Sequence, residues 1–249
     1  HAVAKGRVWS GEKAIKLGSQ ILSKNNVKTF KLDSEVLMSS VLKKKRSFMI
    51  LNSQDKLNKS SFNHYQNLIK QRSLGKPVAY LLGKKEFWNL EFKISEHVLI
   101  PRPDTELLIE ETLKISQNRK KLKILDIGVG SGCILLSILN EKKDFYGVGV
   151  DISKKCIDLS KINAEKIGIT RRIKFFKSDI DNFNYGKYDL IISNPPYINN
   201  IDIKYLDREV YKFEPKIALK GGLGGLSKIK KIIDKSSKLI KLNGKLILE

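Results

Sequence analysis

A short segment, Asn194-Pro195-Pro196-Tyr197, follows directly after the apolar run 188–193. Proline fixes φ and lacks an N–H group, so the carbonyls of Asn194 and Pro195 are available to accept hydrogen bonds. The side chain of Asn194 adds another acceptor oxygen, and Tyr197 adds a flat ring that can cover a planar group. These residues predict a site for an NH₂ group on an sp² carbon, in a carboxamide or an exocyclic base amine, although a plain turn has a similar composition.

A glycine-rich turn precedes this segment in the chain, between the apolar runs 122–127 and 133–139. The pattern predicts a strand, a turn and a helix. Closely spaced glycines let the backbone approach a ligand, and the N-terminus of a helix directs N–H groups at it. The turn lacks the Gly-Lys-Ser/Thr ending of a P-loop, and Cys133 stands where the dinucleotide fingerprint needs its third glycine. The residues of the turn that we expect to contact a ligand are Gly128, Val129, Gly130, Ser131 and Gly132.

Two acidic residues stand at the ends of the first two predicted strands. Asp126 lies where the strand 122–127 enters the turn, and a carboxylate there repels a pyrophosphate but can hold an ammonium group. Asp151 follows the next strand, 145–150. An acidic residue at the carboxyl end of the second strand is placed to bind both hydroxyls of a ribose. Taken singly, each carboxylate is more simply explained as a helix cap or a solvated loop residue.

Asp179 and Ile180 follow a third predicted strand, 172–177. A carboxylate with an apolar neighbour can hold an adenine by its amine and its face. An ammonium site, a ribose site and an adenine site at successive strand ends together predict S-adenosylmethionine as the cofactor. Asn194, at the end of the fourth strand, completes the set of residues that we expect to contact it.

Together these motifs resemble the class I S-adenosylmethionine-dependent methyltransferases that carry an Asn-Pro-Pro-Tyr signature. More narrowly, the chain is similar to the HemK/PrmC family, the N(5)-glutamine methyltransferases of peptide chain release factors. The narrower resemblance rests on the segments 72–83, 87–93, 98–106 and 213–219, and it covers roughly residues 12–249. It implies an α/β fold, a Rossmann-like and mostly parallel sheet, with a small N-terminal helical bundle.

The resemblance also implies an activity. A methyl group would pass from S-adenosylmethionine to the side-chain amide nitrogen of the glutamine in the Gly-Gly-Gln motif of class I peptide chain release factors. The side-chain oxygen of Asn194 and the carbonyl of Pro195 would hold that NH₂ group, and Tyr197 would pack on the amide plane. We therefore expect Asn194, Pro195 and Tyr197 to be catalytic, and Pro196 to join them in binding the substrate.

Three alternatives remain open at this point. The Asn-Pro-Pro-Tyr segment also suits an adenine-N(6) nucleic-acid methyltransferase, because adenine carries an exocyclic amine. The chain could also be a glutamine methyltransferase of a ribosomal protein, or a non-catalytic module that binds RNA or the ribosome. The formal net charge of +22 agrees with partners that contain nucleic acid. However, the lysines are spread along the chain, as a genome rich in A and T would encode, so direct nucleic-acid binding is not favoured.

The sequence predicts three parts. An N-terminal helical substrate-binding domain should occupy residues 1–83, a β-hairpin connector 84–106, and a methyltransferase catalytic domain 107–249. In the first part, apolar residues at i, i+3, i+4 and i+7 predict a bundle of about four or five helices, since these positions share one helix face. In the connector, alternating residues predict the hairpin at 87–100.

Other features exclude some classes of protein. No apolar run is long enough to span a bilayer, and nothing at the N-terminus resembles a signal peptide. The two cysteines, Cys133 and Cys156, favour a reducing compartment, so we expect a cytoplasmic protein. The three histidines, His1, His64 and His97, lie far apart in the chain, and no metal site is predicted.

Two features depart from the family's pattern. The segment 221–226 lacks the acidic residue that the family usually has there. The chain also stops after 244–249, at what would be the fifth strand of a seven-stranded sheet, and it begins with His1 instead of methionine. The sequence therefore predicts a fragment clipped at both ends, with an incomplete catalytic domain.

Overall fold

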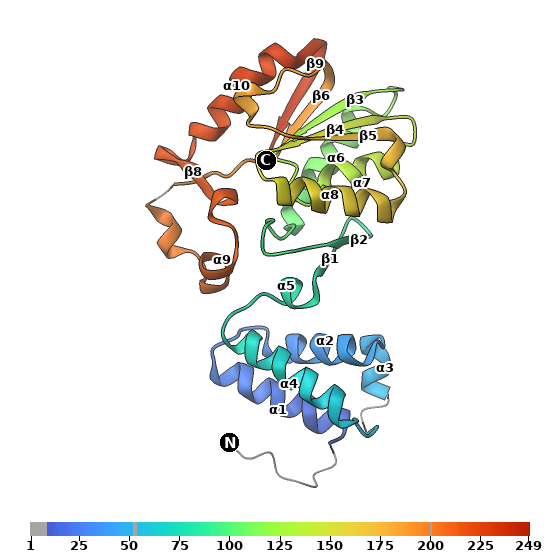
Figure 1. Ribbon diagram of the computed structural model, residues 1–249, viewed down its shortest axis with the longest axis vertical. Helices are drawn as coiled ribbons and strands as arrows, with labels where there is room; N and C mark the ends of the chain where they lie inside the picture. The colour runs from blue at the N-terminus through green and yellow to red at the C-terminus, as the bar shows by residue number, and fades with distance from the viewer. Residues whose placement is uncertain (1–8, 52–53, 200) are drawn as a thin grey trace. The chain divides into compact units, whose positions relative to one another are not determined.

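The computed structural model describes residues 9–51, 54–199 and 201–249. His1 and the rest of the first eight residues of the predicted N-terminal domain lie outside the described residues. The chain forms two compact units, which divide between Leu82 and Gly83 (Figure 1). None of the helices in the described part of the chain is long and apolar enough to cross a membrane.

The first unit is helical, as its apolar periodicity predicts. In its described residues it contains α1 (Gly11–Lys24), α2 (Phe30–Leu42), α3 (Arg46–Leu51), α4 (Lys59–Ser73) and α5 (Val78–Leu82). Side chains that recur at helical spacing form its core, among them Leu22, Leu37, Met38 and Ile69, which are almost completely buried. The predicted bundle of four or five helices is therefore confirmed.

A buried ion pair joins α2 to α4. Arg72 donates from Nε to Oδ2 of Asp33 over 2.6 Å, and both side chains are more than 90% buried. Thr29 donates from its hydroxyl to the same oxygen over 2.8 Å. Because both charges are desolvated, the pair holds the two helices in one register only while both partners are present.

The second unit begins with a short hairpin of β1 (Lys84–Phe87) and β2 (Leu90–Lys93). The prediction of a hairpin at 87–100 was wrong in its position, since the turn falls at Trp88 and Asn89. These two residues have φ values of 48° and 55°, the left-handed geometry of a tight two-residue hairpin turn. Tryptophan is an uncommon residue in such a turn, so the sequence carried little signal for it.

The central sheet contains β3 (Lys123–Ile127), β4 (Tyr146–Asp151), β5 (Ile173–Lys177), β6 (Tyr188–Ser193) and β9 (Ile240–Leu248). Its strand order is β5-β4-β3-β6-β9, and every neighbouring pair is parallel. The predicted parallel α/β fold is therefore confirmed. The strand order reverses between β3 and β6, and ligands of open α/β sheets bind at the carboxyl ends of strands at such a point.

Helices cover both faces of the sheet. The helices α6 (Glu106–Ile115), α7 (Cys133–Glu141), α8 (Lys154–Ile167) and α10 (Ser227–Leu239) do most of this covering. On one face, β4 approaches α7 so closely that a Cβ on Gly147 would come within 3.2 Å of Leu135. On the other face, Leu125 and Val148 belong to one apolar cluster with Ile232 of α10. Figure 1 shows α10 on the opposite side of the sheet from α7 and α8.

Between β6 and α10 the chain forms a small irregular region. It holds β7 (Ile198–Asn199), α9 (Arg208–Phe213) and β8 (Lys220–Gly222), and β7 pairs in parallel with β8.

Short 3₁₀ helices occur throughout the second unit. They lie at Pro103–Thr105 (η1), Thr170–Arg172 (η2), Ile180–Asn182 (η3), Asp202–Tyr205 (η4), Lys216–Ala218 (η5) and Leu223–Gly225 (η6).

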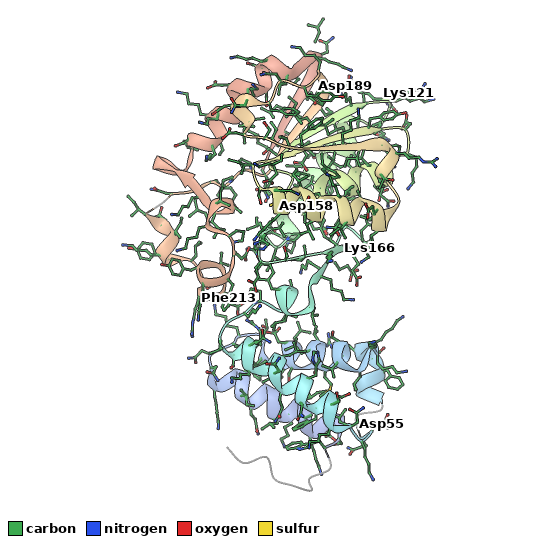
Figure 2. All side chains as sticks on the ribbon, in the orientation of Figure 1. Asp55, Lys121, Asp158, Lys166, Asp189 and Phe213 are labelled. Carbon is green, nitrogen blue, oxygen red and sulfur yellow. The ribbon has the colours of Figure 1, made fainter. Side chains whose placement is uncertain are left out.

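The two edges of the sheet have different roles. The amino edge carries Lys121 and Asp189 (Figure 2), where Asp189 accepts a hydrogen bond from the backbone N–H of Lys123 over 2.8 Å. This bond joins the start of β6 to the start of β3. The carboxyl edge, at the other end of these strands, carries the residues that were predicted to bind ligands.

Candidate active site

A cavity of about 230 Å³ opens at the carboxyl edge of the sheet. It is lined from four strand ends, which lie next to one another because the strands are parallel. The predicted site residues that line it are Gly128, Val129, Gly130, Ser131, Asp151, Asp179, Ile180, Asn194, Pro195 and Pro196. The structure therefore brings most of the predicted site together, whereas Asp126, Gly132 and Tyr197 do not line this cavity.

The glycine turn after β3 has a conformation that needs glycine. Gly128, Gly130 and Gly132 have φ values of 79°, 56° and 83°, which L-residues with a side chain rarely adopt. A Cβ on Gly132 would also lie 2.9 Å from Leu136 of α7. The turn therefore passes close to the N-terminus of α7 and presents backbone, without side chains, to the cavity. Gly132 supports this arrangement from behind the cavity wall.

Asp151 fastens the glycine turn to the next strand. Its Oδ2 accepts a hydrogen bond from the N–H of Gly130 over 3.0 Å, and its Oδ1 accepts one from the N–H of Ser153 over 2.8 Å. Burial raises the pKa of Asp151, and these two hydrogen bonds oppose the shift. Each carboxylate oxygen can accept a second bond. Both oxygens can therefore also bind ligand hydroxyls, and the ribose role stays a prediction.

Asp126 lies behind the turn and is only 1% exposed. Neither of its carboxyl oxygens has a hydrogen-bond partner of regular geometry among the described residues, and the backbone N–H of Leu135 only opposes the rise of its pKa. Burial, and after it the negative charge of Asp151, raises the pKa of Asp126 to about 8. An unpartnered buried carboxyl is costly, so this group favours a nearby cation or donor. Its predicted contact with an ammonium group remains a prediction.

Asp179 and Ile180 line the cavity at the end of β5. Oδ1 of Asp179 accepts a hydrogen bond from the N–H of Asp181 over 3.0 Å and so caps the short helix η3. Phe176 and Ile180 pack against the apolar cluster that contains Ile232 of α10. One carboxylate oxygen and an apolar side chain therefore border the cavity, which is the combination predicted for an adenine.

Asn194 is held by two side chains that the sequence had not assigned to the site. Its Nδ2 donates to Oγ1 of Thr105 over 3.1 Å and to Oε2 of Glu249 over 2.8 Å. In the described part of the chain, no group donates to the Oδ1 of Asn194. This leaves its carbonyl oxygen as an acceptor at the cavity. Tyr197 is 55% exposed, and its predicted packing on a substrate amide remains a prediction.

The proximity of Glu249 to Asn194 follows from the register of two strands. β6 and β9 pair in parallel with Ser193 opposite Leu248, so the residues after them are neighbours. The N–H of Glu249 continues this ladder by donating to the carbonyl of Ser193 over 3.2 Å. The rule that placed Asp151 at a ligand site applies equally to Glu249, which also follows an apolar strand at its carboxyl end.

Residues outside the sheet close one side of the cavity. The side chain of Glu214 is 1% exposed and accepts hydrogen bonds from Arg102 over 2.5 Å and from the N–H of Ile100 over 3.3 Å. These contacts join the connector to the segment after α9. Both segments contribute to the cavity wall, the connector through Arg102 and the segment after α9 through Ile217. The sequence had marked both segments only by their resemblance to a family.

The backbone of the Asn-Pro-Pro-Tyr segment is supported by the glycine-rich segment 221–226. Gly221 lies so close that a Cβ there would come within 2.8 Å of the carbonyl oxygen of Pro196. Gly225 approaches the carbonyl of Tyr197 even more closely and has a φ of 73°. These glycines therefore let β8 and η6 pack directly behind the Asn-Pro-Pro-Tyr segment.

The residues of the cavity fit S-adenosylmethionine. The turn of Gly128 and Gly130 gives close backbone approach to the cavity, and Asp126 lies behind this turn, outside the cavity lining, as a buried carboxyl that can attract an ammonium group. Asp151 has acceptor capacity for hydroxyls, and Asp179 borders the cavity where an adenine amine is expected. Their order along the sheet matches the order of these groups in the cofactor.

Two parts of the chain match described domain families. Residues 13–83 match the PrmC N-terminal domain, and residues 103–209 match the methyltransferase small domain. The solved structure of an S-adenosylmethionine-dependent methyltransferase from Geobacter sulfurreducens, in complex with S-adenosyl-L-homocysteine, is also similar. Its TM-score is 0.39 at 15% identity, over 59% of this chain and 47% of that chain.

Several relatives match most of the chain. The release factor glutamine methyltransferase of Buchnera aphidicola subsp. Acyrthosiphon pisum is 38% identical over 96% of this chain and 84% of its own length. The enzyme of the same name from Clostridium acetobutylicum is 37% identical, over 92% of this chain and 81% of its own length. The enzyme of the same name from Bradyrhizobium diazoefficiens is 34% identical, over 88% of this chain and 74% of its own length. The chain therefore belongs to the family of release factor glutamine methyltransferases.

Proposed function

We propose that this protein transfers a methyl group from S-adenosylmethionine to the side-chain amide nitrogen of a glutamine, that of the Gly-Gly-Gln motif in class I peptide chain release factors. The observation that carries this proposal is the side chain of Asn194, whose Nδ2 is occupied by Thr105 and Glu249 while its Oδ1 remains an acceptor at the cavity. Family membership supports the choice of substrate.

An amide nitrogen is a poor nucleophile, because its lone pair is delocalised into the carbonyl. Oδ1 of Asn194 and the carbonyl of Pro195 act as two acceptors for the two hydrogens of the substrate NH₂ group. They fix the direction of the nitrogen, and holding reactants in such an orientation can lower a barrier by roughly 7–11 kcal/mol in favourable cases. The same two acceptors stabilise positive charge as it develops on the nitrogen. The methyl–sulfur bond breaks as the methyl–nitrogen bond forms, and the methylated nitrogen then loses one proton to water.

The cofactor, when bound, supplies an electrophilic methyl group on a sulfonium. The chain's own contribution is to hold and orient the groups around that methyl. The backbone of the glycine turn allows close approach, and Asp151 keeps this turn in place through Gly130. Asp126, Asp151 and Asp179 offer carboxyl groups along the edge of the sheet. Tyr197 covers the plane of the substrate amide.

Class I release factors are the proposed protein partners, and the cytoplasm is the proposed location. The Gly-Gly-Gln motif suits this site, since two glycines without side chains let the glutamine reach into a narrow cavity. Residues 13–83, which include most of the first unit, match the PrmC N-terminal domain. We assign this unit the role of binding the release factor. The segments 84–106 and 107–249 serve as connector and catalytic domain.

The proposal is tested with S-adenosylmethionine that carries a labelled methyl group. The protein is incubated separately with a release factor, with ribosomal proteins and with DNA, and the label in each pool is counted. Label in the release factor alone is expected. Label in DNA would support an adenine-N(6) methyltransferase instead, and label in a ribosomal protein would move the substrate to that class. A release factor with its motif glutamine changed to alanine is the matched control.

A further inference from the structure

Three side chains form a closed set of hydrogen bonds at the rim of the cavity. Asn194 donates from Nδ2 to both Thr105 and Glu249, over 3.1 and 2.8 Å. Thr105 donates from its hydroxyl to the second oxygen of Glu249 over 3.1 Å. Glu249 thus accepts on both carboxylate oxygens, and Thr105 accepts one bond and donates one. Every polar atom of the set has a partner except Oδ1 of Asn194.

This arrangement determines which end of the Asn194 amide faces the cavity. As a carboxylate, Glu249 can only accept hydrogen bonds, so it selects the NH₂ end of the amide. If the amide rotated by half a turn, two acceptor oxygens would face each other without a hydrogen between them. The hydrogen bond to Glu249 would be lost in this partly buried contact and the two oxygens would repel each other, so the rotated state is disfavoured. Asn194 is consequently fixed with Oδ1 available for a substrate.

We propose that Glu249, with Thr105, is the positioning residue that orients the amide of Asn194 as a hydrogen-bond acceptor for the substrate NH₂ group. Glu249 acts through Asn194 and does not itself contact the substrate. The inference rests on the proposed function, because it assigns the bond at Oδ1 to that substrate. It explains why an acidic residue follows β9 next to the end of β6.

The charge of Glu249 has a second effect. Hydrogen bonds in a chain polarise one another, so a carboxylate on the NH₂ end makes the Oδ1 end a stronger acceptor. That effect grows in value as the substrate nitrogen becomes positive. Burial, and after it the charge of Asp104, raises the pKa of Glu249, and the hydrogen bond from Thr105 opposes the shift. Asp104 is exposed, and Asp104→Asn removes only a charge that raises the pKa of Glu249, so Glu249 stays a carboxylate with its hydrogen bonds in place and the variant serves as a control.

The first experiment measures the orientation of the amide without any activity. Protein labelled with ¹⁵N-asparagine is examined by NMR, and the side-chain NH₂ signals of Asn194 are assigned by their loss in Asn194→Ala. In the wild type these two protons should exchange slowly with water. In Glu249→Gln the new amide can offer either end to Asn194, so the signals should shift and exchange should accelerate at least about tenfold. Asp104→Asn should leave them unchanged.

The second experiment separates orientation from binding. Glu249→Gln and Thr105→Val should lower kcat by about tenfold to a hundredfold, the range expected from misplacing a reacting group. KM for S-adenosylmethionine should change less than about threefold. Thr105→Ser keeps the hydroxyl and should restore most of the activity that Thr105→Val loses. Asp104→Asn should keep kcat within about twofold of the wild type.

Each outcome decides a separate question. Unchanged Asn194 signals and unchanged kcat in Glu249→Gln would overturn the positioning role. A raised KM for S-adenosylmethionine with a normal kcat would overturn it too, because Glu249 would then serve the cofactor. If Glu249→Gln does not fold, the pair Thr105→Val and Thr105→Ser decides by the same measurements. If the wild type methylates no release factor, the proposed function fails, while the NMR comparison still reports on the orientation of the amide.

Discussion

Asp151 accepts a hydrogen bond from the backbone N–H of Gly130 over 3.0 Å, so the carboxyl end of β4 holds the glycine turn that follows β3. The residue predicted to bind a ligand hydroxyl is thus also part of the support for the neighbouring ligand site. Gly130 has a φ of 56° and a second support from behind, since Ser160 of α8 donates to its carbonyl over 2.9 Å. The turn is therefore preorganised in the described structure.

Replacing Asp151 should weaken cofactor binding. Asp151→Ala removes the partner of Gly130 and the expected partner of the ribose hydroxyls, a loss of about 1–3 kcal/mol in binding free energy. Calorimetry with S-adenosylmethionine measures it. Asp158 lies on the exposed side of α8, where it pairs with Lys154, and Asp158→Ala is the matched control that should bind normally. Equal affinity in the two variants would remove Asp151 from the cofactor site.

Replacing Asn194 should affect the chemical step more than binding. Asn194→Ala removes an acceptor whose bond strengthens in the transition state, so kcat should fall about a hundredfold to a thousandfold, by analogy with the loss of an oxyanion-hole donor. Asn194→Asp still accepts hydrogen bonds, but its carboxylate would face that of Glu249, so only part of the activity should remain. Steady-state kinetics give both values. A near-normal kcat in Asn194→Ala would reduce Asn194 to a turn residue.

The buried carboxyl of Asp126 should make stability depend on pH. Its pKa is raised to about 8 in the folded protein, from about 3.9 in an unfolded chain. Between these values the folded state holds a proton that the unfolded state has lost. This contribution to stability is therefore complete below about pH 4 and is lost as the pH rises through about 8.

Urea unfolding of wild type and Asp126→Asn over this pH range isolates the effect. As the pH rises from about 4 to about 8, the wild type should lose a few kcal/mol of unfolding free energy relative to the variant, on the order of the shift in pKa. Parallel pH dependence of both proteins would show that Asp126 titrates normally. Because the charges of Asp126 and Asp151 interact, the difference between the two proteins reports on the titration of this pair of carboxyls.

The ion pair between Arg72 and Asp33 should be essential to the first unit. Asp33→Asn replaces the carboxylate that faces Nε of the buried Arg72 with a neutral amide, and breaking such a pair costs about 3–5 kcal/mol. Glu35, on the same helix, pairs with Arg46 at a site where the Arg46 side chain is 52% exposed. Glu35→Gln should cost less than about 1 kcal/mol. Chemical denaturation of the two variants compares them, and similar losses in both would contradict this account.

The sequence predicted the strand ends correctly because a parallel sheet collects them at one edge. Asp151, Asp179 and Asn194 each follow an apolar run, and their proximity needs only the strand–helix alternation and the rule for carboxyl ends. Glu249 obeys the same rule. Its contact with Asn194 could not be predicted, because it depends on β9 pairing with β6 across the intervening residues 194–239.

Conformations that depend on a few backbone angles could also not be predicted from the sequence. The hairpin turn at Trp88 and Asn89 has positive φ at both residues, although tryptophan gives no such signal. The pairing of β7, directly after Tyr197, with β8 is a contact between two short segments that carry weak strand patterns. Asp126 was expected among the cofactor contacts, and only the packing of α7 over the turn reveals how completely it is buried.

The most direct test of the central claim is tandem mass spectrometry of a release factor after reaction with this protein and S-adenosylmethionine. We predict one added methyl group, located on the side-chain nitrogen of the glutamine in the Gly-Gly-Gln motif, and about a hundredfold or more slower methylation of the same nitrogen by Asn194→Ala. A methyl group found on another residue, or an unmodified glutamine in a release factor incubated with active protein, would contradict it.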